Sequence, residues 1–456
     1  MPGLHDFATW QPLLRLLRAA HAETLDTPGG HVSGQISLGA WSVPLPWRDP
    51  EPGQASLVSD HQDEFDAVGT VVEALEEGGV DEVSFVVEGS SAPGGVRLHL
   101  IDLGPSAEPG IASAHPGTLL LADCALPEPA RRLPEAVTDR APAPSADPEL
   151  LRRTLLERLP DAVGATDQEL AEAEARLGMA MPPELATLYR TLRGRYEDWH
   201  DDQDPFDVVG CELLPLDQVY VADAASRHVL WRFGALDAVE TWPEDAVQGL
   251  VGSPGWIVFG DNGGGDRIAV DLTPGPDGHL GQVIIISHEE NIGADLVADS
   301  LTDMVVHGQD GGREIRRVTR PPLVAHVNHA SVPSVEAAAH PGLEVLSIGV
   351  LRQKPVSLAP VLGLPRLRAL AAYPGTLADP REISALTGLE YLALPHAEWR
   401  VLVDAGAVPT GLLAADIQGH RPQDNPLHTI ALADEILALF GRPPIAGVTV
   451  LEGAVL

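Results

Sequence analysis

The sequence predicts an α/β protein of the α+β type that is divided into more than one domain. Its 456 residues exceed what a single hydrophobic core usually serves, so we expect roughly two to four domains. Some segments carry apolar residues at helical spacing, and others alternate polar and apolar residues as strands do. A stretch rich in proline and alanine at residues 134–148 separates two such regions and is typical of a linker.

The formal net charge of −37 at pH 7 is the strongest compositional feature. It opposes binding to nucleic acid and to anionic membranes, and it favours fast encounter with a basic protein partner. Lys354 is the sole lysine, as in proteins from high-GC genomes, and such genome bias explains part of the acidity. Neither a signal peptide nor an apolar run of roughly 20 residues is visible. Cys124 and Cys211 are expected to be buried and unpaired, and the protein to be cytoplasmic.

Residues 1–133 are expected to form a mixed α/β domain whose function no recognisable motif indicates. Apolar residues at helical spacing predict helices over residues 7–21 and 61–77, and Gly78-Gly79 is a common helix stop. Strand-like runs bounded by Pro-Gly or Gly-Gly steps are present at residues 32–38, 82–87, 96–103 and 118–122.

Residues 256–272 form the pattern around which the middle domain, residues 149–315, is organised. An apolar run at 256–259 and an alternating run at 267–272 flank the sequence Gly260-Asp261-Asn262-Gly263-Gly264-Gly265-Asp266. Because asparagine and glycine adopt positive φ cheaply, this pattern predicts a β-hairpin with a wide loop. A further strand is expected at residues 281–287.

Three helices are predicted to precede this hairpin. Asp147 or Pro148 starts the first, which runs through Leu159. Thr166 and Glu169 have the spacing of a capping box at the start of the second, which stops at Gly178. The third begins at Met181-Pro182-Pro183, since proline is tolerated in the first turn of a helix.

Specific matches to a known family begin in these helices. The matching runs are Thr166-x-x-Glu169, Glu174, Leu177-Gly178, Met181-Pro182-x-Glu184-Leu185-x-x-Leu188-Tyr189, residues 211–219, 256–260, 264–266 and 281–283, and Ala298-x-Ser300-Leu301-x-x-Met304-Val305. In this order they resemble the SUKH superfamily, which includes a yeast cell-wall regulator and many bacterial toxin-immunity proteins. The resemblance covers about residues 150–310 and implies helices packed on an antiparallel sheet. One departure is Leu192-Arg193-Gly194-Arg195, where the family usually has Asn-Gly-Gly.

The last part of the chain, residues 316–456, contains an internal repeat. Leu343-Glu-Val-Leu346-Ser-Ile348 recurs from Leu367, from Leu389 and, in a degenerate form, from Leu412. This resembles leucine-rich repeats, in which each copy is a short strand of a solenoid. Residues 358–362 and 383–386 would be the intervening helices, 427–440 a capping helix and 448–451 a final strand.

Two stretches are the candidate partner-binding sites. Residues 197–207 are the densest acidic stretch and include two aromatic side chains, which suits recognition of a basic partner. The alternatives for this stretch are a solvated loop and a calcium site, although the ligand spacing of a calcium-binding helical loop is absent. The hairpin loop could hold an anion or metal between its aspartates, but it lacks a phosphate-loop ending and a following helix, so a wide loop is preferred. The candidate residues are Asp198, Trp199, Asp201, Asp202, Asp204, Phe206, Asp207, Trp231, Asp261, Asn262 and Asp266.

Trp231 and Trp242 are also candidates for the core, and His288 is expected at the surface. No catalytic constellation is visible, so we expect a protein that is not an enzyme and needs no cofactor or metal. The resemblance implies a bacterial immunity-type protein that binds and neutralises a toxin domain, and a basic toxin would suit the net charge. The first alternative is an intracellular regulatory scaffold or adaptor without a toxin partner. The second is an enzyme or small-ligand-binding domain in residues 1–133. The sequence indicates neither the identity of the partner nor the oligomeric state.

Overall fold

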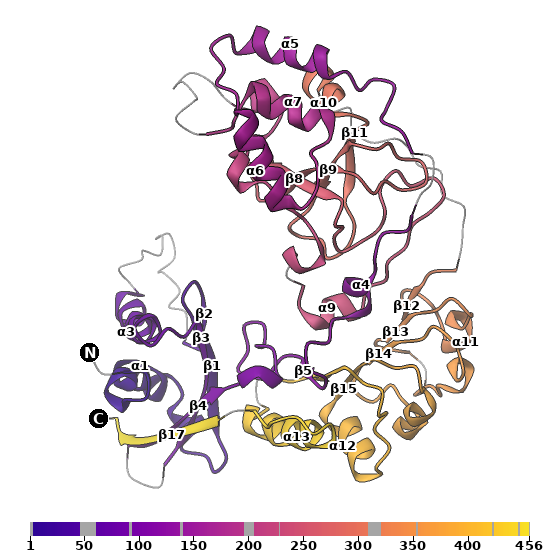
Figure 1. Ribbon diagram of the computed structural model, residues 1–456. Helices are drawn as coiled ribbons and strands as arrows, with labels where there is room; N and C mark the ends of the chain where they lie inside the picture. Colours follow the sequence, from indigo (N-terminus) through magenta and orange to yellow (C-terminus); the bar gives the residue numbers. More distant parts are fainter. Residues whose placement is uncertain are drawn as a thin grey trace, which may run out of the picture. The chain divides into compact units, whose positions relative to one another are not determined.

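The computed structural model describes residues 3–45, 61–90, 94–136, 140–195, 205–227, 229–308, 321–352, 354–421, 424–445 and 447–455. Helices and both antiparallel and mixed sheets are present, so the predicted α+β class is confirmed. Contacts group the chain into two units (Figure 1). Unit 1 comprises Met1–Ala125, His326–Pro341 and Leu346–Leu456, and unit 2 comprises Leu126–Ala325 and Gly342–Val345.

Unit 2 contains an antiparallel sheet in the strand order β11-β10-β9-β8-β6, and β7 also pairs with β8. Its hairpin joins β8 to β9, and β10 follows it, which confirms the predicted meander. The strands are β6 (Glu212–Leu213), β7 (Tyr220–Val221), β8 (Trp256–Asp261), β9 (Arg267–Asp271), β10 (Gln282–Ile286) and β11 (Asp295–Ala298).

Two helices of unit 2 begin where their capping residues predict, whereas the third ends at Thr191 and not at the predicted Gly194. Thr166 and Glu169 form the expected capping box, and Gly178 ends that helix with a φ of 71°. Asp147 accepts backbone N–H groups at the start of the preceding helix. The helices are α4 (Glu128–Arg131), α5 (Pro148–Arg158), α6 (Asp167–Leu177), α7 (Pro183–Thr191), α8 (Pro205–Val209), α9 (Trp231–Ala235) and α10 (Leu301–His307).

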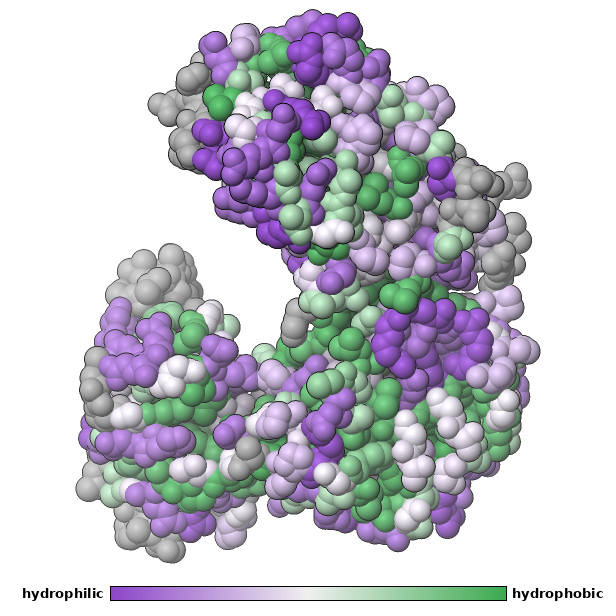
Figure 2. Space-filling model, in the orientation of Figure 1, coloured by the Kyte–Doolittle hydropathy of each residue, from purple (hydrophilic) through white to green (hydrophobic). Residues whose placement is uncertain are grey.

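Both faces of this sheet are covered by apolar side chains. Ile257 and Phe259 of β8 pack with buried residues of α5, α6, α7 and α10. Their neighbours Trp256 and Val258 point to the opposite face, where residues 246–250 cover them. Since alternate residues of a strand face opposite sides, the continuous apolar run of β8 is explained by a sheet that is covered twice. The outer surface of α5 and α6 is largely hydrophilic (Figure 2).

The amino-terminal part of unit 1 is a second sheet with two long helices against it. Trp10 of the first helix packs edge-on against Phe85, with ring centroids 5.3 Å apart. Both rings belong to a core that apolar residues of the two helices and the sheet share. The elements are α1 (Phe7–Ala20), α2 (Ala22–Leu25), β1 (His31–Ser37), β2 (Trp41–Ser42), α3 (Gln62–Gly78), β3 (Glu82–Gly89), β4 (Gly95–Asp102) and β5 (Leu119–Leu120), the last of these outside this sheet.

The edge of this sheet is filled by the final strand of the chain. β17 (Gly447–Ala454) pairs antiparallel with β4 along its whole length, from Gly447 opposite Asp102 to Ala454 opposite Gly95. The resulting strand order is β17-β4-β3-β1-β2 (Figure 1). The sequence predicted a strand at residues 448–451 but not this partner.

Each copy of the internal repeat contains a short buried strand. The third sheet has the order β12-β13-β14-β15-β16-β5, and its repeat strands β14, β15 and β16 pair in parallel. Leu370 lies opposite Leu392, so equivalent repeat positions are in register. Assignment to the leucine-rich repeats stays a prediction. The elements are β12 (Val324–Val327), α11 (Val335–Ala338), β13 (Val345–Ile348), β14 (Ala369–Ala372), β15 (Tyr391–Pro395), α12 (His396–Asp404), β16 (Ala414–Gln418) and α13 (Pro426–Leu439).

Two further expectations concern the cysteines and membranes. Cys211 is buried as predicted, but Cys124 is exposed, so the prediction of a buried side chain was wrong there. Cys124 lies in a loop with a φ of 53°, away from any regular strand or helix that would bury it. In the described part of the chain no helix has both the length and the apolar composition needed to cross a bilayer.

Candidate protein-binding site

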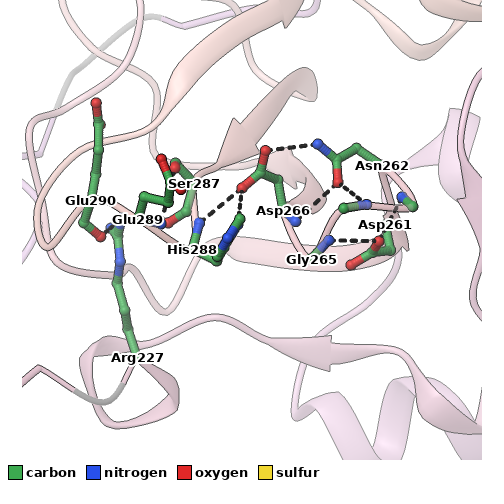
Figure 3. A network of polar contacts seen from close by, with 11 residues as sticks. Arg227, Asp261, Asn262, Gly265, Asp266, Ser287, His288, Glu289 and Glu290 are labelled. Carbon is green, nitrogen blue, oxygen red and sulfur yellow. Dashed lines mark hydrogen bonds and ion pairs between the residues drawn. The ribbon is translucent and has the colours of Figure 1, made fainter. Parts of the chain in front are cut away.

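The loop between β8 and β9 is held by its own side chains (Figure 3). The Asp261 carboxylate accepts the N–H groups of Gly263 and Gly265, at 2.7 and 3.3 Å. The Asn262 side-chain oxygen accepts those of Gly264 and Asp266, at 2.8 and 3.0 Å. Gly263 and Gly265 have φ values of 77° and 97°, which explains why glycine occupies these positions. The wide hairpin loop expected from the sequence is therefore confirmed as an ordered loop.

Asp266 connects this loop to the segment after β10. Its carboxylate accepts the backbone N–H of His288 at 2.9 Å and lies 2.7 Å from Nδ1 of the same residue. These hydrogen bonds from His288 lower the pKa of Asp266, because they favour the ionised carboxylate. The His288 side chain is 53% exposed, so its predicted surface position is confirmed.

Arg227 anchors the segment after β10, residues 287–293. Its buried guanidinium donates to the carbonyl oxygens of Gly293 at 2.9 Å, Ser287 at 3.0 Å and Val251 at 3.3 Å, and to that of Glu290. Burial lowers the pKa of Arg227 to about 10. No sequence pattern indicates the role of Arg227, because its partners are backbone carbonyl groups.

Helix α8 brings part of the acidic stretch against the hairpin loop. A Cβ placed on Gly263 would lie 3.4 Å from the Phe206 ring and 3.7 Å from a carboxylate oxygen of Glu212. Phe206 is 36% exposed, and Asp207 and Glu212 are also exposed. The "loop face" comprises Phe206, Asp207, Glu212, Asp261, Asn262 and Asp266. Glu212 was missed because it lies beyond the acidic stretch, and only its pairing with Asp261 across β6 and β8 brings it here.

The other candidates are placed differently. Asp198, Trp199, Asp201, Asp202 and Asp204 lie outside the described residues. Trp231 and Trp242 are 5% and 8% exposed, which places both among packing residues, so the loop face does not include Trp231.

The chemistry available at the loop face is that of recognition by charge and hydrogen bonds. Ser287, His288 and Asp266 have the residue types of a catalytic triad, but the Ser287 hydroxyl accepts the N–H of Glu289. Among the described residues, no hydrogen bond joins the Ser287 hydroxyl to the His288 ring. Among the residues that the structure describes, no group of three or more His, Cys, Asp or Glu side chains is arranged to hold a metal ion.

Comparison with known proteins identifies the domain that carries this face. Residues 164–307 match the sequence model of the SMI1/KNR4 family, SUKH-1. This segment belongs to the SUKH superfamily. A glucan synthesis regulatory protein of Neurospora crassa is 39% identical to the chain over 67 residues, which are 15% of the chain and 13% of that protein. A cell wall biosynthesis/cell cycle regulator of Schizosaccharomyces pombe is 28% identical over 145 residues, or 28% of the chain and 27% of that protein. The chain thus spans less than a third of either relative.

The residues that carry the SUKH resemblance have structural roles. The Glu174 carboxylate accepts the N–H of Met181 at 2.9 Å, which closes the turn between α6 and α7. The Tyr189 hydroxyl donates to the carbonyl of Leu214 at 2.8 Å. Glu184 accepts the N–H groups of Leu301 and Thr302. These helical residues of the shared motif specify how the helices of the SUKH domain join its other elements. Glu212 and Asp266 of the loop face lie in other matching runs, residues 211–219 and 264–266.

Proposed function

We propose that the chain is a non-catalytic regulatory protein that acts by binding a basic protein partner through the loop face. The observation that supports this most directly is the packing of Phe206 beside an ordered loop, next to the exposed carboxylates of Asp207 and Glu212. An aromatic side chain within a charged rim is typical of protein interfaces. The relatives that match the SUKH domain are named as regulators, which supports the regulatory class.

The fixed conformation of the hairpin loop should also favour binding. Asp261, Asn262 and Asp266 hold the loop in one conformation before a partner arrives, so little conformational entropy is lost on association. The formal net charge of −37 accelerates encounter with a basic surface, and this acceleration falls as salt screens the charges.

A second form of the proposal is an immunity-type protein whose partner is a toxin. The net charge favours it, because a strongly basic nuclease or deaminase domain is complementary to this chain. The two forms differ in the partner alone. A gene for a toxin beside the gene for this chain supports neutralisation, whereas normal killing by that toxin in the presence of the chain rejects it.

The loop face is tested with charge reversals in the full chain. A D207K/E212K variant is compared with an E157K/D161K variant, which changes the net charge equally through exposed residues of unit 2. Partners captured by the unaltered chain are identified by crosslinking, and affinity is then measured with each purified partner. We expect D207K/E212K to weaken binding at least about tenfold and E157K/D161K to weaken it much less. Equal losses in both variants would show that net charge, rather than this face, drives association.

A further inference from the structure

Unit 1 contains a cavity that the proposed function does not use. Its volume is about 780 Å³, which is in the range of small-molecule sites. It lies beside the start of β1, with residues 112–115 and residues 420 and 421 on its wall. Four imidazoles, those of His21, His31, His115 and His420, line it together with the Arg421 side chain.

The lining of this cavity contains one arginine and no described carboxylate, although the chain is strongly acidic. Aspartate and glutamate number 66 in the chain against 29 lysines and arginines, yet no aspartate or glutamate is among the described lining residues. The Arg421 side chain is exposed and forms no ion pair with any described residue. Hydroxyl groups of four serines and threonines add further hydrogen-bonding groups. This set of side chains is complementary to an oxyanion.

Two of the imidazoles have unused nitrogen atoms. Nε2 of His31 and Nε2 of His420 are buried and have no hydrogen-bond partner among the described residues. The His420 ring stacks on His115 with centroids 3.9 Å apart, and Nδ1 of His115 lies 3.0 Å from the Thr429 hydroxyl oxygen. A buried polar atom without a partner is unfavourable, and rotation of either ring toward the cavity would allow its nitrogen to bind a ligand oxygen.

The histidines of this cavity make anion binding depend on pH. Burial lowers the pKa of His115 to about 4 and lowers the pKa of His420, so both rings are neutral at pH 7. The charged and titratable groups that act on them are His31, His396, Asp416 and Asp424, besides one another. A bound anion would favour the protonated rings and would therefore be bound together with protons.

We propose that this cavity binds a small organic oxyanion, a phosphate or carboxylate group joined to a compact apolar body. His31, His420 and Arg421 face the oxyanion, and the apolar wall formed by Val32, Pro44 and Ala114 accommodates the body. The inference concerns unit 1 and is independent of the loop face. It assigns a binding role to a part of the chain whose sequence carries no functional motif.

Isothermal titration calorimetry of the full chain tests this proposal with four probes: phenyl phosphate, benzoate, phenol and inorganic phosphate. We expect phenyl phosphate or benzoate to bind more tightly than phenol, and the tighter of the two identifies the phosphate or the carboxylate as the preferred group. Affinity should rise as pH falls from about 8 to about 6, and heats measured in buffers of different ionisation enthalpy should reveal proton uptake. Failure of both phenyl phosphate and benzoate to bind, or equal binding of phenol, overturns the proposal.

Variants locate the binding in this cavity. Arg421→Gln and His420→Gln should each weaken binding about tenfold, and Arg352→Gln, which replaces an exposed arginine outside the cavity lining, should leave it unchanged. Arg421 is exposed, so R421Q keeps the test informative even if H420Q disturbs folding. Unchanged affinity in R421Q and in a folded H420Q would place binding elsewhere and reject this site.

Discussion

The carboxylate of Glu184 in α7 lies 3.1 Å from the backbone nitrogen of Thr302 in the first turn of α10. It also accepts the N–H of Leu301 at 3.2 Å, so one side chain satisfies two free N–H groups at a helix start. Because these residues are far apart in sequence, this contact ties the beginning of the SUKH domain to its end. Burial raises the pKa of Glu184, and the hydrogen bonds offset part of that effect.

Glu184→Gln should destabilise the SUKH domain by about 1–3 kcal/mol, because an amide nitrogen would face backbone donors. Hydrogen–deuterium exchange of peptides that cover α10 should accelerate. Glu172→Gln, an exposed change on α6, should alter stability by less than about 0.5 kcal/mol. Protection of α10 in E184Q equal to that of the unaltered chain would contradict the capping role.

Asp271 predicts a pH dependence of the same domain. It is fully buried in β9, and burial raises its pKa to about 6, although Thr273 and Gln282 donate hydrogen bonds to it. Between about pH 4 and pH 6 the folded form therefore holds a proton that the unfolded form has released. The stability contributed by this residue should fall as pH rises through that window, by an amount of the order of 3 kcal/mol.

The Asp271→Asn variant isolates this effect, because its side chain does not ionise. Exchange rates of peptides from β8 to β10 should show a smaller loss of protection between about pH 4.5 and pH 7 than in the unaltered chain. A pH profile identical in both proteins would show that Asp271 titrates normally.

Asp266→Asn should loosen the hairpin loop without unfolding the domain. The variant loses the ionised acceptor for His288, whose hydrogen bonds lower the pKa of Asp266. That stabilisation is present above the usual carboxyl pKa and is lost as pH falls through the lowered pKa of Asp266. The stability of the variant should therefore differ most from that of the unaltered chain near neutral pH. The Asp266–His288 pair is partly exposed, so we expect the variant to lose less than about 1 kcal/mol of stability. Hydrogen–deuterium exchange should become faster only at residues 262–266 and 288.

Arg227→Met should be the most damaging of these substitutions. It would leave four carbonyl oxygens without their donor, three of them in the segment 287–293. We expect a loss of at least about 3 kcal/mol in urea denaturation followed by the fluorescence of the buried tryptophans. Arg152→Met, at an exposed position on α5, serves as the control. Similar midpoints for R227M and R152M would contradict the anchoring role.

The sequence predicted elements well where local chemistry decides them. Thr166 with Glu169 marked a helix start, Gly79 and Gly178 marked helix ends, and the Asn-Gly step marked the hairpin. These signals depend on neighbouring residues alone. The repeat likewise predicted strands β13 to β16 of the third sheet, because its last two apolar positions are two residues apart, as on one face of a strand.

Relationships between distant segments were not predictable in this way. Glu212 and Phe206 meet the hairpin loop because β6 pairs with β8, and nothing local to either residue indicates that pairing. The histidine cavity has no sequence signal, because His31, His115 and His420 are far apart in the sequence and share no fixed spacing. Arg227 binds carbonyl groups, which every residue carries.

The pairing of β17 with β4 has a consequence for biosynthesis. During translation β4 emerges from the ribosome well before its partner β17, because the SUKH segment and the repeat strands lie between them in the sequence. The open edge of β4, with its row of unsatisfied backbone groups, must wait while the SUKH segment and the repeat strands are made. Nascent chains halted before residue 447 would therefore expose an aggregation-prone strand edge, which synthesis of β17 would cover.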